Sequence, residues 1–309
     1  MINSDNSHLK VAALSHPGEI REINEDRYSV ANYLREADQL PVILAIVADG
    51  IGGHQAGEVA AQMAVDQIST EIAETSAEDP VAELSEAIIG AGRSITQAST
   101  QDEALQGMGS TISAAMVVGD RLYTVSVGDS RTYLFRAGKV QQISIDHTWV
   151  QEAINHGILT PEEARNHPNA HVLHRHLGGD RDPQPDPRLR LSVDETDEES
   201  EANQGLKLAA RDRILLCSDG LTDLVEDPEI EQILTDHSTE EAASALVDMA
   251  RSRGGHDNIT LVIVEGPEAD SGRPGGRLKS GVRLVASAVV LLLLVAIGLF
   301  LSYLLGFWP

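Results

Sequence analysis

The stretch VADGIGGHQAGEVAA, residues 47–61, joins the end of an apolar run to one aspartate, three glycines, a histidine and a helical pattern. The run 42–48 predicts a strand that ends at Asp49, and apolar residues recur with helical spacing over 60–72. Glycines in such a turn let the backbone approach a ligand closely, because no side chain stands in the way. The stretch therefore predicts a strand, a loop and a helix. Asp49 stands at the end of the strand, where the loop leaves room for a ligand.

Other acidic residues stand at the ends of apolar runs in the same way. They are Glu25, Asp26, Asp129, Asp219 and Asp257. Taken singly, an Asp-Gly pair is an ordinary turn. Taken together, carboxylates at strand ends can converge at one end of a sheet, where their repulsion must be offset by positive charge. Hard divalent cations with oxygen ligands are the candidates.

The composition limits the class of protein. Forty-eight acidic and 23 basic side chains give a formal charge of -25, which argues against nucleic-acid binding and suits divalent cations. The single cysteine, Cys217, excludes an internal disulfide and any multi-cysteine zinc site, and its apolar neighbours indicate a core residue.

Strand and helix signals alternate over residues 1–265, which we interpret as one α+β domain. Segments 121–127 and 131–137 flank the turn Gly128-Asp129-Ser130 and predict a β-hairpin. The acidic run 194–201 predicts a surface loop without a function. Residues 266–283, rich in Gly, Pro and charge, predict a flexible basic linker.

The C-terminal sequence carries no charged side chain from Leu284 to Pro309. Because about 20 apolar residues span a bilayer as a helix, we expect a transmembrane helix over 284–305 and a short tail over 306–309. Arginines and a lysine precede this span, so the positive-inside rule predicts a single-pass protein of the plasma membrane with its main domain in the cytoplasm.

Six segments of the chain resemble the signature segments of the PPM family, the type 2C metal-dependent Ser/Thr protein phosphatases, and most closely their bacterial, membrane-anchored form. The segments are RxxNED at 21–26, ADGIGGH at 48–54, GMGST at 107–111, GDSR at 128–131, CSDGL at 217–221 and HDNIT at 256–260. The stretch 146–179 is similar to the part of the bacterial enzymes that leads into a mobile flap. The resemblance implies a four-layer αββα sandwich with two central antiparallel sheets.

The resemblance also implies the roles of individual residues. Asp49 would bridge both metals of a binuclear Mg²⁺ or Mn²⁺ centre, with the Gly50 carbonyl on one of them. Asp219 and Asp257 would hold one metal, and Glu25 and Asp26 would orient waters on the other.

Two further positions match the family pattern. Asp129 with Asp219 matches a third metal position of bacterial members, and Arg21 matches the arginine that binds the substrate phosphate. Guanidinium suits that role independently, because it is planar, always charged and able to bind phosphate oxygens in pairs.

The implied activity is hydrolysis of phosphoserine and phosphothreonine in proteins, by a hydroxide that bridges the two metals and without a covalent enzyme intermediate. Partners would be phosphorylated proteins, Ser/Thr kinases and their substrates, and the membrane. Two alternatives remain: a phosphoprotein-binding or scaffold module without turnover, and an enzyme that acts on regulators of sigma factors. The complete set of acids favours the general phosphatase.

The chain departs from some family members after the Asp-Gly pair, where they carry a histidine as candidate general acid. Ile51 stands there and cannot donate a proton, which leaves the general acid open, with metal-bound water as one candidate. We interpret His54 as a structural residue that bonds loop backbone. The flap histidines match no zinc spacing and are predicted to be surface residues: His167, His171, His174 and His176.

Overall fold

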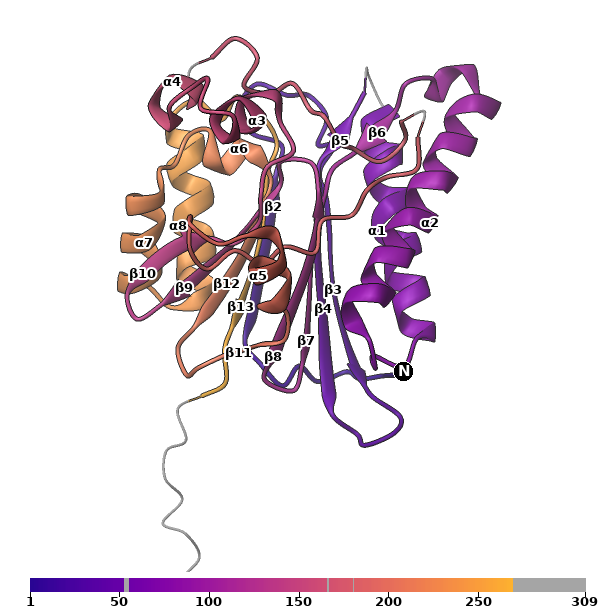
Figure 1. Ribbon diagram of the computed structural model, residues 1–309, viewed down its shortest axis with the longest axis vertical. Helices are drawn as coiled ribbons and strands as arrows, with labels where there is room; N and C mark the ends of the chain where they lie inside the picture. Colours follow the sequence, from indigo (N-terminus) through magenta and orange to yellow (C-terminus); the bar gives the residue numbers. More distant parts are fainter. Residues whose placement is uncertain (53–55, 166, 180, 269–309) are drawn as a thin grey trace, which may run out of the picture. The chain divides into compact units, whose positions relative to one another are not determined.

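The computed structural model describes residues 1–52, 56–165, 167–179 and 181–268 (Figure 1). Residues 1–268 form one compact unit. No helix within the described residues is long and apolar enough to cross a membrane. The expected linker beyond residue 268, the expected membrane helix over 284–305 and His54 lie outside the described residues.

Two antiparallel sheets form the centre of this unit (Figure 1). The six-stranded sheet has the order β1 (Ile2–Asn3), β3 (Arg27–Leu34), β4 (Pro41–Ala48), β7 (Ile112–Val118), β8 (Arg121–Val127) and β11 (Leu206–Lys207). The five-stranded sheet has the order β10 (Lys139–Gln142), β9 (Arg131–Arg136), β12 (Arg213–Cys217), β13 (Ile259–Glu265) and β2 (Val11–His16). A two-stranded piece pairs β5 (Gly50–Ile51) with β6 (Gly109–Ser110).

Helices cover the outer face of each sheet. The six-stranded sheet is covered by α1 (Ala56–Glu74) and α2 (Pro80–Gln101), and the five-stranded sheet by α7 (Asp227–Asp236) and α8 (Thr239–Ser252). The short helices are η1 (Glu103–Leu105), α3 (Trp149–Asn155), α4 (Pro161–Arg165), α5 (Asp197–Ala202) and α6 (Asp219–Thr222). The predicted α+β class with antiparallel sheets is confirmed, and the helix predicted within 60–72 is present as α1.

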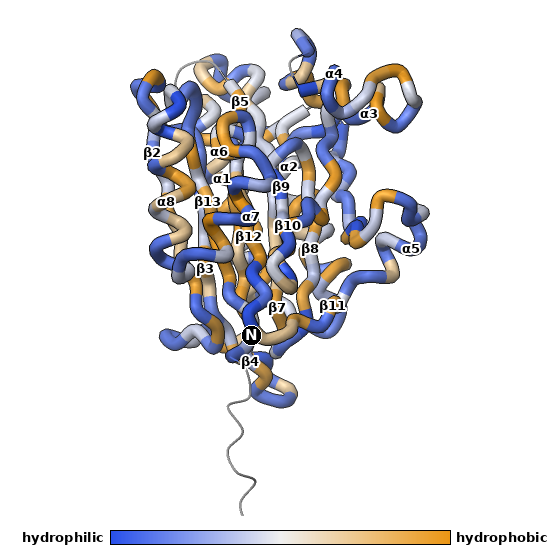
Figure 2. Tube along the Cα trace, turned by 90° about the vertical axis from the view of Figure 1, so that its left-hand side faces the viewer, coloured by the Kyte–Doolittle hydropathy of each residue, from blue (hydrophilic) through white to orange (hydrophobic). Residues whose placement is uncertain are grey.

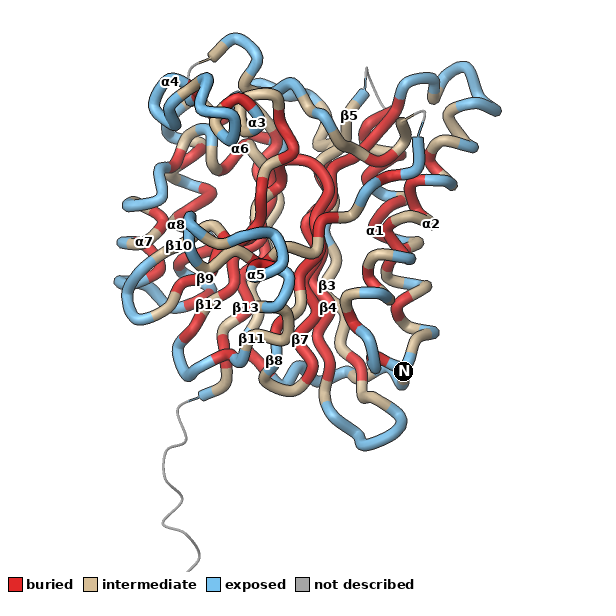
Figure 3. The backbone as a smooth tube through the Cα atoms, in the orientation of Figure 1, coloured by how far each residue is buried: buried red, intermediate tan, exposed pale blue. Residues whose placement is uncertain are grey.

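Alternation along the strands separates the layers of the core. In β4, Leu44 and Ile46 pack against α1 and α2, whereas Ile43 and Val47 point into the space between the sheets. Both faces of β4 are buried, which accounts for its continuous apolar run. Figure 2 shows the apolar residues concentrated on the central strands, and Figure 3 shows the same strands as the buried part of the fold.

The predicted β-hairpin over 121–137 is wrong. β8 pairs with β7 and β11 in one sheet, whereas β9 pairs with β12 and β10 in the other. The turn at Gly128 therefore carries the chain from one sheet to the other. Two strands with alternating apolar residues and a short turn between them fit a hairpin in one sheet, and they fit equally well two strands in facing sheets. In both cases every second side chain of each strand is buried. The consequence for the site is that Asp129 lies where the two sheets connect.

The prediction of a loop over 194–201 is wrong for its second half, which forms α5. Thr196 is the N-cap of this helix: its hydroxyl accepts the Glu199 N–H at 3.2 Å, and the Glu199 carboxylate accepts the Thr196 N–H at 2.9 Å. This reciprocal capping box favours the start of a helix at this point, although the acidic composition of the segment indicates a loop.

Candidate metal centre

The six predicted acids gather at one end of the two sheets. Asp49 follows β4, Asp219 follows β12, and Asp257 precedes β13. Glu25 and Asp26 precede β3, and Asp129 occupies the connection between β8 and β9. Each of these acids lies close enough to at least one other for their charges to interact, so the fold brings the whole predicted set together.

The backbone of Asp49 is held by Ser110 at the end of β6 and by Thr111, which directly precedes β7. The Asp49 N–H donates to Thr111 Oγ1 at 3.0 Å, and the Asp49 carbonyl accepts the Thr111 N–H at 2.8 Å and the Ser110 hydroxyl at 3.0 Å. These bonds occupy the backbone groups of Asp49, so its side chain alone is left to act at the site.

Asn258 connects the two loops that carry the remaining acids. Its side-chain oxygen accepts the Glu25 N–H at 2.7 Å, and its amide group donates to the carbonyls of Pro17 and Ile23, each at 3.0 Å. Ser218 donates its hydroxyl to Asp26 Oδ2 at 2.7 Å. The loop before β3 is thereby fixed against the start of β13 and the end of β12.

The carboxyl groups repel one another strongly. Burial, followed by the charges of Asp26, Asp219 and Asp129, raises the pKa of Asp49 well above its usual range. Burial and the Asp219 charge do the same to Asp129. Burial raises the pKa of Asp26 to about 7, although the Ser218 hydroxyl opposes it. Protons therefore stabilise this cluster when no other positive charge does.

The cluster also contains oxygens without hydrogen-bond partners. Within the described residues, these buried atoms include Glu25 Oε1, Asp26 Oδ1 and Asp219 Oδ1. A buried unpartnered carboxylate oxygen is costly unless a cation binds it. Oxygen donors of this kind are the ligands that Mg²⁺ and Mn²⁺ prefer, so the residues fit the predicted metals.

Glycine is required where the loop after Asp49 passes the start of α1. A Cβ at Gly50 would lie 2.3 Å from the Gly57 carbonyl oxygen, and a Cβ at Gly57 would lie 2.8 Å from Glu25 Oε1. Both positions exclude a side chain, so the Gly50 backbone can lie directly against the acids.

Arg21 lies at the rim of this cluster, where its side chain is 52% exposed. Its Nη2 donates to Asp257 Oδ2 at 2.7 Å, and this contact raises the pKa of the guanidinium. Arg21, Asp219 and Asp257 line a pocket of 420 Å³ together with His256. The predicted phosphate-binding residue therefore opens onto the same pocket as two predicted metal ligands.

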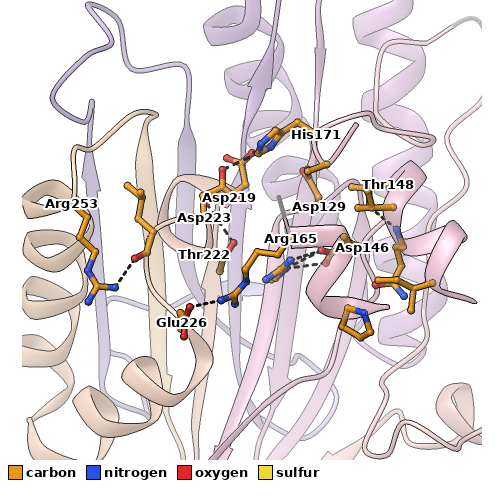
Figure 4. A pocket seen from close by; sticks show the side chains of 18 residues that line it. Asp129, Asp146, Thr148, Arg165, His171, Asp219, Thr222, Asp223, Glu226 and Arg253 are labelled. Carbon is orange, nitrogen blue, oxygen red and sulfur yellow. Dashed lines mark hydrogen bonds and ion pairs between the residues drawn. The ribbon is translucent and has the colours of Figure 1, made fainter. Parts of the chain in front are cut away.

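A second pocket, of 680 Å³, shares His171 and Asp219 with the first (Figure 4). It is lined by Asp129, Asp219 and Asp223, and by residues of α3 and α4. His171 Nδ1 lies 3.7 Å from Asp219 Oδ2 and 3.8 Å from Asp223 Oδ2. Asp219 raises the pKa of His171 to about 9, and burial together with the Asp219 charge raises the pKa of Asp223 to about 6.

Sequence reasoning missed Asp223 as a member of the site. The available signal was its position four residues after Asp219, which puts both side chains on one face of a helical turn. The flap histidines agree in part with the surface prediction, since His171 and His174 are exposed, while His167 and His176 are partly buried. His171 nonetheless contacts the acids. Ile51 lies in β5, opposite Gly109, and carries no proton to donate.

Comparison with known proteins supports the resemblance. The family model described as Protein phosphatase 2C matches residues 21–251. The chain is 37% identical over 267 residues to the "Serine/threonine protein phosphatase PstP" of Mycobacterium tuberculosis, covering 86% of this chain but 46% of that protein. It thus spans about half the length of this relative. It is 36% identical to the "Serine/threonine phosphatase stp" of Listeria monocytogenes, covering 83% of this chain and 95% of that protein.

Solved structures give the same result. The crystal structure of the M. tuberculosis phosphatase PstP/Ppp has 35% identity and a TM-score of 0.70, covering 84% of this chain and 99% of that one. The catalytic domain of PstP, solved in complex with two manganese ions, has 34% identity and a TM-score of 0.67 over 83% of this chain and 97% of that one. The matching segments, the fold and the gathered acids all lie within this common region, and the chain belongs to the protein phosphatase 2C family.

Proposed function

We propose that the chain is a metal-dependent protein phosphatase that hydrolyses phosphoserine and phosphothreonine. The observation that carries this proposal is the cluster of six acids with unpartnered buried oxygens beside Arg21 and its pocket. Relatives named as serine/threonine phosphatases, one of them with two manganese ions, support the reaction and the metal.

Each group at the site has a proposed part in the reaction. Asp49, Asp219, Asp257, Glu25, Asp26 and the Gly50 carbonyl would hold two Mg²⁺ or Mn²⁺ ions, and Asp129 with Asp219 would border a third. Such ions, when bound, acidify a water and neutralise charge on the phosphoryl group.

Arg21 would bind phosphate oxygens in the 420 Å³ pocket. Its present partner, Asp257, is itself a proposed metal ligand. A carboxylate that binds a cation needs the guanidinium less as counter-charge, so Arg21 can turn to the substrate.

The test is phosphate release from a phosphothreonine peptide by the full chain with Mn²⁺, with Mg²⁺ and with EDTA. We expect release with metal and none with EDTA. Arg21→Ala should raise KM about tenfold or more and change kcat less, because phosphate is bound in the ground state as well. A folded chain that binds the peptide but releases no phosphate with either metal would contradict the proposal and favour a phosphoprotein-binding module.

We propose further that residues 284–305 anchor the chain in the plasma membrane with residues 1–265 in the cytoplasm, close to membrane-bound Ser/Thr kinases whose action it reverses. The uncharged sequence from 284 to 309 and the cations before it support this arrangement. The full chain should be recovered with membranes after high-salt washing, and residues 1–268 should be recovered in the supernatant. Recovery of the full chain in the supernatant would contradict the anchor.

A further inference from the structure

His147 occupies a buried position between the metal centre and the flap. It lies between β10 and α3, its side chain is 4% exposed, and both ring nitrogens have partners. Nδ1 lies 2.9 Å from the backbone nitrogen of Gly128, and Nε2 lies 2.9 Å from Asp186 Oδ2. Gly128 directly precedes Asp129, so the ring contacts the turn that carries a proposed metal ligand.

These partners determine which ring nitrogen carries the proton. The Gly128 N–H can only donate, so Nδ1 must accept. Nε2 then carries the hydrogen and donates it to Asp186. Burial would raise the pKa of the Asp186 carboxyl, but hydrogen bonds from Arg188 and His147 outweigh it and hold that pKa well below its usual range. Asp186 is therefore a permanent acceptor that maintains this tautomer.

His147, Asp186 and the end of β8 are joined to one another by a closed set of hydrogen bonds. The Asp186 backbone exchanges hydrogen bonds with Ser126 of β8, at 2.9 and 3.1 Å. The His147 N–H donates to the Gly128 carbonyl at 2.9 Å. Gly128 has φ +107°, and a Cβ there would lie 2.6 Å from Thr111 Cγ2, so the turn is pressed against the residue that holds Asp49.

Asp146, which directly precedes His147, binds Arg131 on the other side of the turn at residues 128–130. The Asp146 carboxylate accepts hydrogen bonds from Arg131 Nε at 2.9 Å and Nη2 at 2.7 Å. Asp129 is thus bracketed, with Gly128 bound by His147 and Arg131 bound by Asp146. Figure 4 shows Asp129, Asp146 and Thr148 around the same pocket.

Residues 147 and 148 also contact residues 173 and 174, which lie further along the flap-like stretch 146–179. The His147 carbonyl accepts the His174 N–H at 2.8 Å, and Thr148 pairs with Leu173 before it caps α3. We infer that His147 is a positioning residue that sets the backbone of Asp129 through its neutral Nε2–H tautomer and joins that turn to the flap. This inference rests on the proposed function, because the role of Asp129 toward metal is assigned there.

Three variants separate this role from simple packing. In His147→Asn, the amide oxygen is attached to Cγ, as Nδ1 is, so it can accept the Gly128 N–H but cannot reach Asp186. In His147→Gln, the terminal amide reaches the depth of Nε2, so it can serve Asp186 but not Gly128. His147→Ala loses both contacts.

The measurement is Mn²⁺ binding to the full chain by calorimetry, together with the Mn²⁺ concentration for half-maximal phosphate release. Changes in groups that orient metal ligands typically cost about 10–100-fold in affinity. We expect at least about tenfold weaker binding at the site that uses Asp129 in His147→Gln and His147→Ala, and a change within about twofold in His147→Asn. Equal losses in the Asn and Gln variants, or none in any variant, would overturn the inference.

Asp129→Asn provides the matched control. It should weaken the same binding step, and adding His147→Ala to it should cause little further loss, since the positioned ligand is already gone. If Asp129→Asn leaves Mn²⁺ binding unchanged, the proposed role of Asp129 fails. If Asp129→Asn weakens binding while His147→Ala does not, the positioning role of His147 fails. In ¹⁵N-labelled chain with EDTA, a His147 ring protonated at Nδ1 would also overturn the inference.

Discussion

Asp49→Asn is expected to lower kcat/KM for a phosphothreonine peptide by at least about 10³-fold in Mn²⁺. The reason is that Asp49 is the acid whose charge interacts with Asp26, Asp219 and Asp129 together, so its loss weakens the shared cation site. Stabilisation by metal ions is worth several kcal/mol in a transition state, and each 1.36 kcal/mol is about tenfold in rate. Steady-state kinetics over a range of Mn²⁺ concentrations measure the effect.

Protein stability distinguishes this loss from misfolding. In EDTA at neutral pH, Asp49→Asn should unfold at a temperature equal to or above that of the unchanged chain, because one of several repelling carboxyl groups has been removed. Asp236→Asn, at the exposed end of α7, is the matched control and should leave both kinetics and stability unchanged. Turnover of Asp49→Asn close to that of the unchanged chain would contradict the proposed centre.

Removal of metal should make the stability of the chain fall as pH rises. The pKa of Asp26 is raised from 3.8 to about 7, so between these values the folded chain binds a proton that the unfolded chain has lost. Its contribution is complete below about pH 4 and is lost as pH passes 7. About two of these pKa units are crossed between pH 5 and pH 8, which corresponds to roughly 3 kcal/mol at most and thus to a change in Tm on the order of 10 °C. Thermal unfolding in EDTA at pH 5 and pH 8 measures it.

Two comparisons identify the source of that pH dependence. General repulsion from the charge of -25 has the same sign, but it is screened by about 0.5 M salt, whereas the buried cluster is not. Asp26→Asn should reduce the difference in Tm between the two pH values, and Mn²⁺ should raise Tm mainly at pH 8. An unchanged Tm across this range in EDTA would show that the acids do not share protons as the structure indicates.

The strands and long helices could be predicted from the sequence because their patterns are local. The run before Asp49 and the helical spacing over 60–72 each determine one element. Which strands pair is not local: residues 121–127 and 131–137 have the same alternation whether they form a hairpin or face each other across two sheets. The structure places them in different sheets, because β9 pairs with β12, about 80 residues further along the chain.

The residues of the candidate site also fall into those with a local sequence signal and those without one. The six acids could be predicted because each stands beside a recognisable segment at a strand end. His171 and His147 could not, because their roles depend on contacts made by the fold, whereas Asp223 had one local signal, its position four residues after Asp219. His147 in particular shows no unusual spacing, and its two partners, Gly128 and Asp186, lie 19 residues before it and 39 residues after it.

The crossing at Gly128 has a consequence for the order of folding. The six-stranded sheet contributes Asp49, the five-stranded sheet contributes Asp219 and Asp257, and Asp129 lies on the link between them. Neither sheet with its own helices contains the complete set of proposed ligands, so a half-assembled chain would lack the proposed cation site. Metal binding at these residues would therefore stabilise only the docked pair of sheets and, by mass action, would make their unfolding a single cooperative event.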